Sequence, residues 1–118
     1  MATPDTNDIV IYRGDTTSLV FTYEDVNGDP IDVTGYSAKF QARKDTDAST
    51  ADIDLSSAGG TITVGTTNGL FTVSISATIT AALDSDDYDY DLQVTDGSSN
   101  IRTISRGTIT LLKDVTRT

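Results

Sequence analysis

Several residue types on which enzyme chemistry depends are missing from this 118-residue chain. It contains no cysteine, no histidine and no tryptophan. Without cysteine there is no disulfide and no thiol nucleophile, and cysteine usage indicates no redox compartment. Without histidine as well, the base of a catalytic triad and the usual zinc ligands are absent. No glycine-rich phosphate loop followed by lysine occurs either. We therefore expect a protein that is not an enzyme and binds no cofactor.

Positive charge and long apolar runs are also scarce. The net charge is −10, from 18 acidic against 8 basic residues. Such a chain lacks the basic stripe that neutralises phosphates, so we expect neither nucleic acid nor an anionic membrane as partner. No apolar run approaches membrane-spanning length, and the N-terminus has no signal-peptide pattern. We expect synthesis in a cytoplasm.

Aspartate and threonine dominate what is present, while Glu24 is the only glutamate. Aspartate favours turns and threonine favours strands, so this bias predicts few helices. The stretch Asp87–Thr95 alternates strictly between apolar and polar residues, which predicts a strand with one face in a core and one in water. Similar short segments recur about every ten residues. The predicted strands are 8–13, 17–23, 31–33, 36–43, 53–55, 61–64, 70–76, 87–95 and 100–115.

This spacing predicts an all-β fold, an antiparallel immunoglobulin-like β-sandwich of about eight short strands with one short helical turn. We expect residues 1–7 to be an N-terminal arm and residues 8–118 to be a single domain. The helical turn is predicted at 78–83, capped by Thr78 or Thr80, with Ile79, Ala82 and Leu83 toward the core. The predicted core comprises Phe21, Phe40, Phe71, Tyr88, Tyr90, Leu92 and Ile109.

Two features concern the last strands. Tyr88 follows a short turn and precedes Tyr90 by two residues, which is the layout of a tyrosine corner, where the hydroxyl bonds a nearby backbone carbonyl. The alternative is that both are plain core aromatics. A slip in alternation predicts a bulge at Gly107. A four-residue loop after Thr95 would then place Asp89 opposite Arg106.

The tripeptide Arg13-Gly14-Asp15 matches a known adhesion motif, but glycine and aspartate between two strands are also ordinary turn chemistry, which we favour. Asp25, Asn27 and Asp29 offer alternate oxygen ligands and are the candidate calcium ligands. Their glycine falls at the fourth position rather than the sixth, and no glutamate follows at the twelfth, so a hairpin turn is favoured over a calcium loop. The acidic run 84–91 is a further candidate for a hard cation, against the alternative of a solvated face.

The chain resembles the small β-sandwich domain at the N-terminus of phage baseplate upper proteins and related phage or prophage tail and fibre proteins. The resemblance covers about Ile11 to Arg117. It is carried by the segments 13–16, 19–22, 25–35, 40–44, 69–73, 80–83, 88–94 and 106–110. It implies a non-enzymatic structural component of a tailed-phage virion that docks onto other virion proteins. Such relatives usually continue into further modules, whereas this sequence stops at Thr118. We therefore expect attachment, joining or decoration rather than receptor binding.

Two alternatives stay open. One is a capsid decoration or head-fibre protein, and the other is a calcium-stabilised adhesive domain of a bacterial surface protein. For the virion role we expect other virion proteins, and copies of the chain itself, as partners. We expect these partners to bind two places: the N-terminal arm, and an open edge strand at Ile53–Leu55 or Ile9–Tyr12. The arm would be flexible in the free protein.

Overall fold

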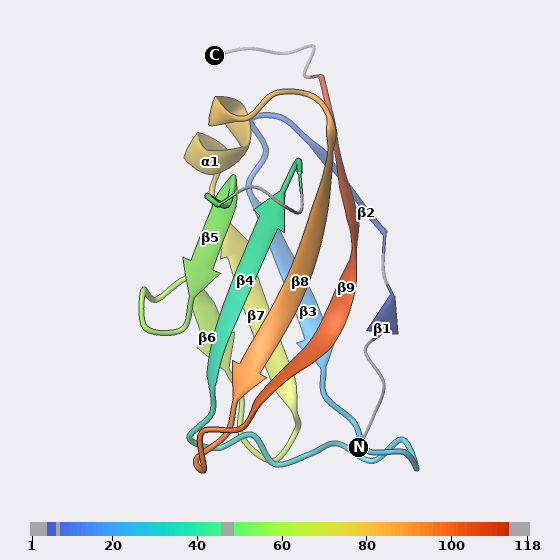
Figure 1. Cartoon of the computed structure of the whole chain (residues 1–118), viewed down its shortest axis with the longest axis vertical. Helices are drawn as coiled ribbons and strands as arrows, with labels where there is room; N and C mark the ends of the chain where they lie inside the picture. Colours follow the sequence, from blue (N-terminus) through green and yellow to red (C-terminus); the bar gives the residue numbers. More distant parts are fainter. Residues whose placement is uncertain (1–4, 7, 46–48, 114–118) are drawn as a thin grey trace.

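Two facing β-sheets make up the domain (Figure 1). The computed structural model describes residues 5–6, 8–45 and 49–113. Within these residues nine strands and one helix are present: β1 (Asp5–Thr6), β2 (Ile9–Tyr12), β3 (Thr17–Thr22), β4 (Ser37–Arg43), β5 (Ile53–Ser56), β6 (Ile62–Val64), β7 (Leu70–Ile75), α1 (Ala77–Ala82), β8 (Asp87–Thr95) and β9 (Ile101–Leu112). The six-stranded sheet has the order β1-β9-β8-β4-β5, with β2 also paired to β9, and the three-stranded sheet has the order β3-β7-β6. The predicted all-β sandwich is confirmed.

The pairing is not wholly antiparallel. Strands β1 and β2 both run parallel to β9, with Asp5 opposite Ser105 and Ile9 opposite Ile109. The other paired strands are antiparallel. Parallel neighbours need a long connection, and here the rest of the domain supplies it, because β2 and β9 lie near opposite ends of the sequence.

Aromatic side chains from both sheets meet in the core. Tyr90 stacks on Phe40 with ring centroids 5.2 Å apart, and Phe21 from the smaller sheet lies 6.3 Å and 6.2 Å from these two rings. The structure buries all seven predicted core residues in one cluster. Their positions follow from the two-residue period, which turns every second side chain inward.

Tyr88 forms a tyrosine corner, the first of the two alternatives that the sequence left open. Its ring is buried, and its hydroxyl donates to the carbonyl oxygen of Asp84 at 2.8 Å. The bond spans four residues and ties the start of β8 to the preceding turn. A bond from the hydroxyl to a backbone carbonyl a few residues upstream is what defines a tyrosine corner.

The predicted register of the last hairpin was wrong. The loop after Thr95 contains five residues, so Thr95 pairs with Ile101, and the ladder then shifts between Leu92 and Gln93 rather than at Gly107. Gly107 pairs in register with Tyr90. The longer loop and the ladder shift each move the pairing by one residue, so together they move it by two. Asp89 and Arg106 therefore stay on the same face of the sheet but no longer lie opposite one another. Arg106 therefore lies opposite Asp91, and Asp89 lies opposite Thr108.

Two smaller expectations also failed. The helix is capped by Ser76, whose hydroxyl accepts from the amide of Ile79 at 3.3 Å, and not by Thr78 or Thr80. Ile79 and Leu83 pack against the core as expected, but Ala82 is exposed.

Residues 31–33 do not form a strand. The amide of Ile31 bonds Tyr23 and the amide of Val33 bonds Thr66. These bonds go to two different segments and make no ladder.

Replacing Tyr88 by Phe keeps the ring and removes only the hydroxyl. We expect a loss of about 1 kcal/mol in the free energy of unfolding, because the Asp84 carbonyl loses its partner. Urea unfolding measures this. The matched control is Tyr12→Phe, at a side chain that is 53% exposed, where we expect no change. Equal effects at both positions would show that the corner bond contributes nothing.

Candidate functional site

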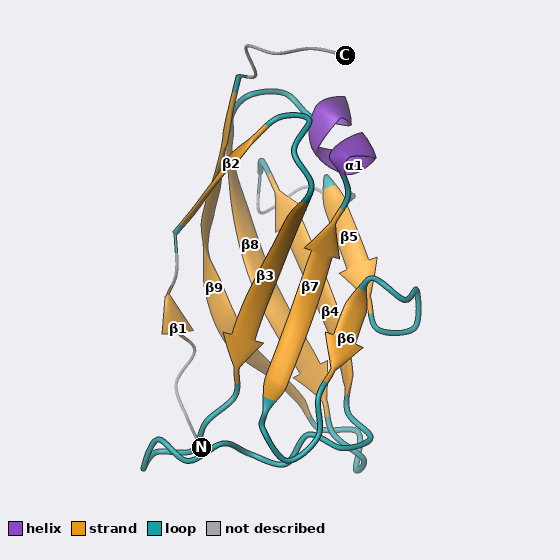
Figure 2. Cartoon of the chain, turned by 180° about the vertical axis from the view of Figure 1, so that it is seen from behind, coloured by secondary structure: helices purple, strands orange, loops and turns teal. Residues whose placement is uncertain are grey.

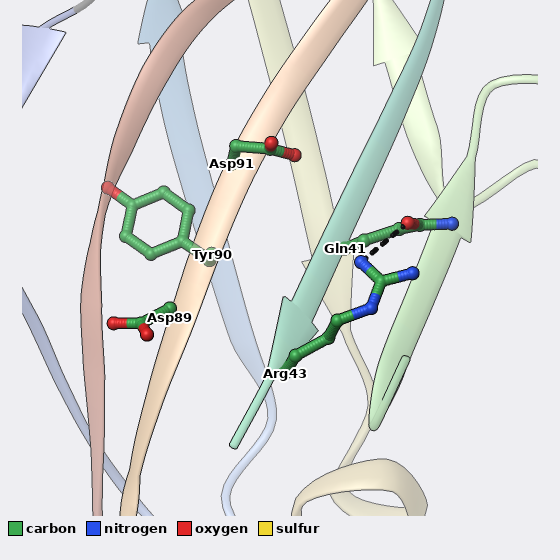
Figure 3. Close-up of a pocket in the computed structure, with 5 residues that line it drawn as sticks. All are labelled: Gln41, Arg43, Asp89, Tyr90 and Asp91. Atoms are coloured by element: carbon green, nitrogen blue, oxygen red, sulfur yellow. Dashed lines mark hydrogen bonds between the residues drawn. The ribbon is translucent and has the colours of Figure 1, made fainter. Parts of the chain in front are cut away.

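A shallow polar pocket of about 150 Å³ lies on the outer face of the six-stranded sheet (Figure 3). It is lined by Gln41 and Arg43 from β4 and by Asp89, Tyr90 and Asp91 from β8. The register places Gln41 opposite Asp91 and Arg43 opposite Asp89. These four side chains share the outer face because they occupy alternate positions on neighbouring strands.

Hydrogen bonds connect this pocket to the sheet edge. The Arg43 guanidinium donates through Nη1 to Oε1 of Gln41 at 3.0 Å, and Nε2 of Gln41 donates to Oδ1 of Asp54 on β5 at 3.1 Å. Figure 3 shows Arg43 and Gln41 side by side, with the carboxylate of Asp91 directed toward them. These hydrogen bonds link β4 to β5, and Asp91 on β8 faces them from the other side of β4.

Burial and charge act against each other at Asp91. This half-buried carboxyl has a raised pKa because burial disfavours its charged form, while the nearby Arg43 guanidinium partly offsets the rise. Burial also raises the pKa of Tyr90, and a hydrogen bond with Ser105 opposes that rise. Asp91, beside the Arg43 guanidinium and the Gln41 amide, can form hydrogen bonds with polar groups of a bound partner. These three side chains do not form the pair of nucleophile and base that covalent catalysis uses.

Gln41 and Arg43 were not predicted as site residues. The acidic run did include Asp89 and Asp91. The sequence signal was the alternation of polar residues along 37–43. It predicted that these side chains face outward, but not which strand lies beside them. Only the β4–β8 register brings the two polar faces together.

The adhesion-like tripeptide holds the loop between β2 and β3 against helix α1. Arg13 donates through Nε to the carbonyl oxygen of Leu83 at 2.6 Å and through Nη2 to that of Ala81 at 3.0 Å. The buried Thr80 hydroxyl accepts from the amide of Gly14 and lies 2.9 Å from the carbonyl oxygen of Asp15. A cation at the C-terminus of a helix satisfies carbonyls that have no partner within the helix. This arrangement supports the turn interpretation over the adhesive one.

The candidate calcium ligands lie in a hairpin turn. Oδ1 of Asp25 accepts from the amides of Asn27 at 2.9 Å and Asp29 at 3.1 Å. The amide of Gly28 bonds the Asp25 carbonyl, and Gly28 has a φ of 83°. A side chain that already accepts from its own turn has less capacity for an ion. The geometry is that of the hairpin we favoured.

The acidic run 84–91 does not converge on one point. Lys44 contacts Asp84 at 3.2 Å and Asp86 at 4.0 Å, and its ammonium lies 5.8 Å from the Tyr88 ring centroid. Asp87 accepts from the hydroxyl of Thr110 at 2.8 Å. Across the described part of the chain, no three acidic, histidine or cysteine side chains gather as a metal site.

Both expected edge strands lie at an edge of the six-stranded sheet: among the described residues, β5 pairs only with β4 and β2 only with β9. The smaller sheet has two further edge strands, β3 and β6, which were not predicted as edges. However, the expected arm is partly docked on its own domain, since Asp5 and Thr6 form β1 against β9. A partner is therefore not needed to hold these two residues. The rest of the predicted arm, residues 1–4 and 7, lies outside the described residues.

The fold and these surfaces define an all-β sandwich domain with a polar outer sheet face. Among the described residues, no helix is long and apolar enough to cross a membrane. No family model and no curated protein matches the sequence. Among solved structures, the chain is similar to the N-terminal domain of phage TP901-1 ORF48. The TM-score is 0.52 at 14% sequence identity, and the likeness covers 95% of this chain and 90% of that one. At this identity the likeness concerns the fold.

Arg13→Lys tests the structural role of the tripeptide. Lysine keeps the charge but cannot reach both carbonyls through a planar fork, so we expect a loss of about 1–2 kcal/mol in the free energy of unfolding. Arg106→Lys, on the exposed face of β9, is the control and should change little. Asp15→Asn should change little as well, because the described hydrogen bonds of Asp15 use only its backbone. A loss at Asp15 that equals the loss at Arg13 would contradict this account.

Asp91→Asn should stabilise the protein at neutral pH. A carboxyl whose pKa is raised on folding favours the folded state when protonated, and this contribution is lost as the pH rises through the raised pKa. Removing the charge removes that cost, so the variant should melt at a slightly higher temperature at pH 7. The gain should vanish as the pH falls below 3.8, the ordinary pKa of an aspartate side chain.

Thermal melts across this pH range measure the effect. Asp89→Asn removes the same charge from an exposed position on the same face of β8 and is the matched control. If the melting temperature rises equally for both variants at every pH, the effect comes from net charge and not from burial of Asp91.

Proposed function

We propose that this chain is a non-enzymatic structural component of a tailed-phage virion that docks onto other virion proteins in the baseplate, tail or a fibre. The observation that carries the proposal is the likeness to the N-terminal domain of phage TP901-1 ORF48, which extends over nearly the whole of both chains. The ordered series of sequence segments that resembles phage baseplate upper proteins supports the same role.

The surfaces of the domain suit such a role. Within the described part of the chain, strands β2 and β5 leave open edges, and an open edge can pair with an extended segment of another protein. The described pocket is shallow and lined by side chains that bond one another. Such a surface fits a protein partner better than a small molecule.

A capsid decoration or head-fibre protein is the alternative within this class. The calcium-stabilised adhesive domain has less support, because Arg13 binds helix α1 and Asp25 binds its own turn. Both features that suggested an adhesin therefore have roles within the fold.

Mass spectrometry of purified particles from the phage or prophage that encodes the chain tests the proposal. We expect the chain in intact particles at a fixed ratio to the major tail protein. When heads and tails are separated on a gradient, it should follow the tails. Presence in heads alone would favour decoration. Absence from particles would overturn the virion role.

A melting experiment tests the remaining alternative, the calcium-stabilised adhesive domain. We expect the melting temperature in calcium to equal that in a chelator. A rise in calcium that Asp25→Asn abolishes, with Asp96→Asn as the control in another turn, would favour the adhesive domain instead.

A further inference from the structure

The three-stranded sheet carries no charge, in a chain that is otherwise strongly acidic. None of the residues of β3, β6 and β7 is charged, and no charged residue occurs anywhere from Leu55 to Leu83. The outward positions of the other sheet, by contrast, carry the side chains of Lys39, Arg43, Asp54, Asp87, Asp89, Asp91 and Arg106. The two faces of the sandwich thus differ sharply in charge.

The outer surface of this sheet, which we call the neutral face, consists of small hydroxyl and aliphatic side chains. Its central row is Val20 of β3, Thr72 of β7 and Thr63 of β6, which lie opposite one another. Flanking rows pair Ser18 with Ser74 and Thr22 with Leu70. Val20 is 62% exposed. Figure 2 views this face directly, and no other described element covers it.

We propose that the neutral face binds the neutral face of a second copy of this chain, one sheet packed on the other around a two-fold axis. Two copies that carry −10 each repel one another at their acidic surfaces. At the neutral face no carboxylates are brought together. A different partner with a basic patch would find nothing there to pair with.

Hydroxyl chemistry also favours self-association. A serine or threonine hydroxyl is both donor and acceptor, so a surface of such groups is complementary to itself under a two-fold rotation. A face of carboxylates, or one of ammonium groups, lacks this property. Val20, in the central row on edge strand β3, can then contact the apolar atoms of the facing copy.

The size of the neutral face limits the affinity. With strands about 4.8 Å apart and about 3.3 Å of rise per residue, the three strands offer roughly 300 Å². A stable interface needs about 800 Å² from each partner. The pair should therefore be weak in solution and become useful where many copies are held close together, as in a repeating assembly. The inference does not depend on the virion role, because the free protein suffices to test it.

Sedimentation and amide NMR spectra from micromolar to millimolar concentration, in low and high salt, provide the test. We expect a monomer at low concentration and concentration-dependent shifts confined to β3, β6 and β7. High salt should strengthen the association by screening the net charge. Val20→Glu should abolish the shifts, because each copy then brings a carboxylate into the central row of the neutral face.

The matched control is Gln93→Glu, which adds the same charge on the exposed outer face of β8. It should leave the association intact. Thr63→Glu replaces Val20→Glu if that variant fails to fold. The proposal is overturned if the protein stays monomeric with unchanged spectra at millimolar concentration in high salt. Shifts that map to the six-stranded sheet, or equal effects of the two charge additions, would overturn it as well. The proposal is also overturned if residues of the neutral face cross-link to a different particle protein while the free chain does not self-associate. That protein would then be the occupant of the face.

Discussion

The stacking of Tyr90 on Phe40, with Phe21 from the facing sheet against both, is the contact on which the sandwich depends. It joins the central strands β4 and β8 to the smaller sheet. Because side chains alternate along a strand, fixing Tyr90 inward also fixes Asp89 and Asp91 outward. The charged face is thus a consequence of the aromatic core. A chain without cysteine has no disulfide to hold its sheets together, so this packing carries that role.

The alternation of apolar residues was sufficient to predict the core and the sandwich, because period two is a local property of the chain. It failed where two consecutive residues of β9, Ile104 and Ser105, are both buried. The slip in alternation between Ile104 and Ile109 was assigned to a bulge at Gly107 instead. The structure shows why Ser105 lies inside: it hydrogen bonds Tyr90. Loop length and this bulge together set the register, and neither is visible in periodicity.

Functional features were harder to predict because they depend on contacts between distant segments. The Arg13 side chain meets the end of helix α1, which lies far along the sequence. Its role is therefore invisible in the tripeptide itself. The pocket around Arg43 arises from the pairing of two strands. The neutral face did have a sequence signal, the charge-free stretch from Leu55 to Leu83. Only the topology shows that this stretch and β3 share one sheet.

These observations describe a domain that keeps a charged sheet in solvent and offers an uncharged sheet for assembly. Hydroxyl-radical footprinting of the free chain and of the chain within purified particles tests this directly. Val20 is 62% exposed on the neutral face, whereas Ile101, on the six-stranded sheet, and Val26, in a loop, are 65% and 75% exposed. The account predicts that Val20 loses reactivity in the particle while Ile101 keeps it. Protection of Ile101 with Val20 unchanged would contradict the account.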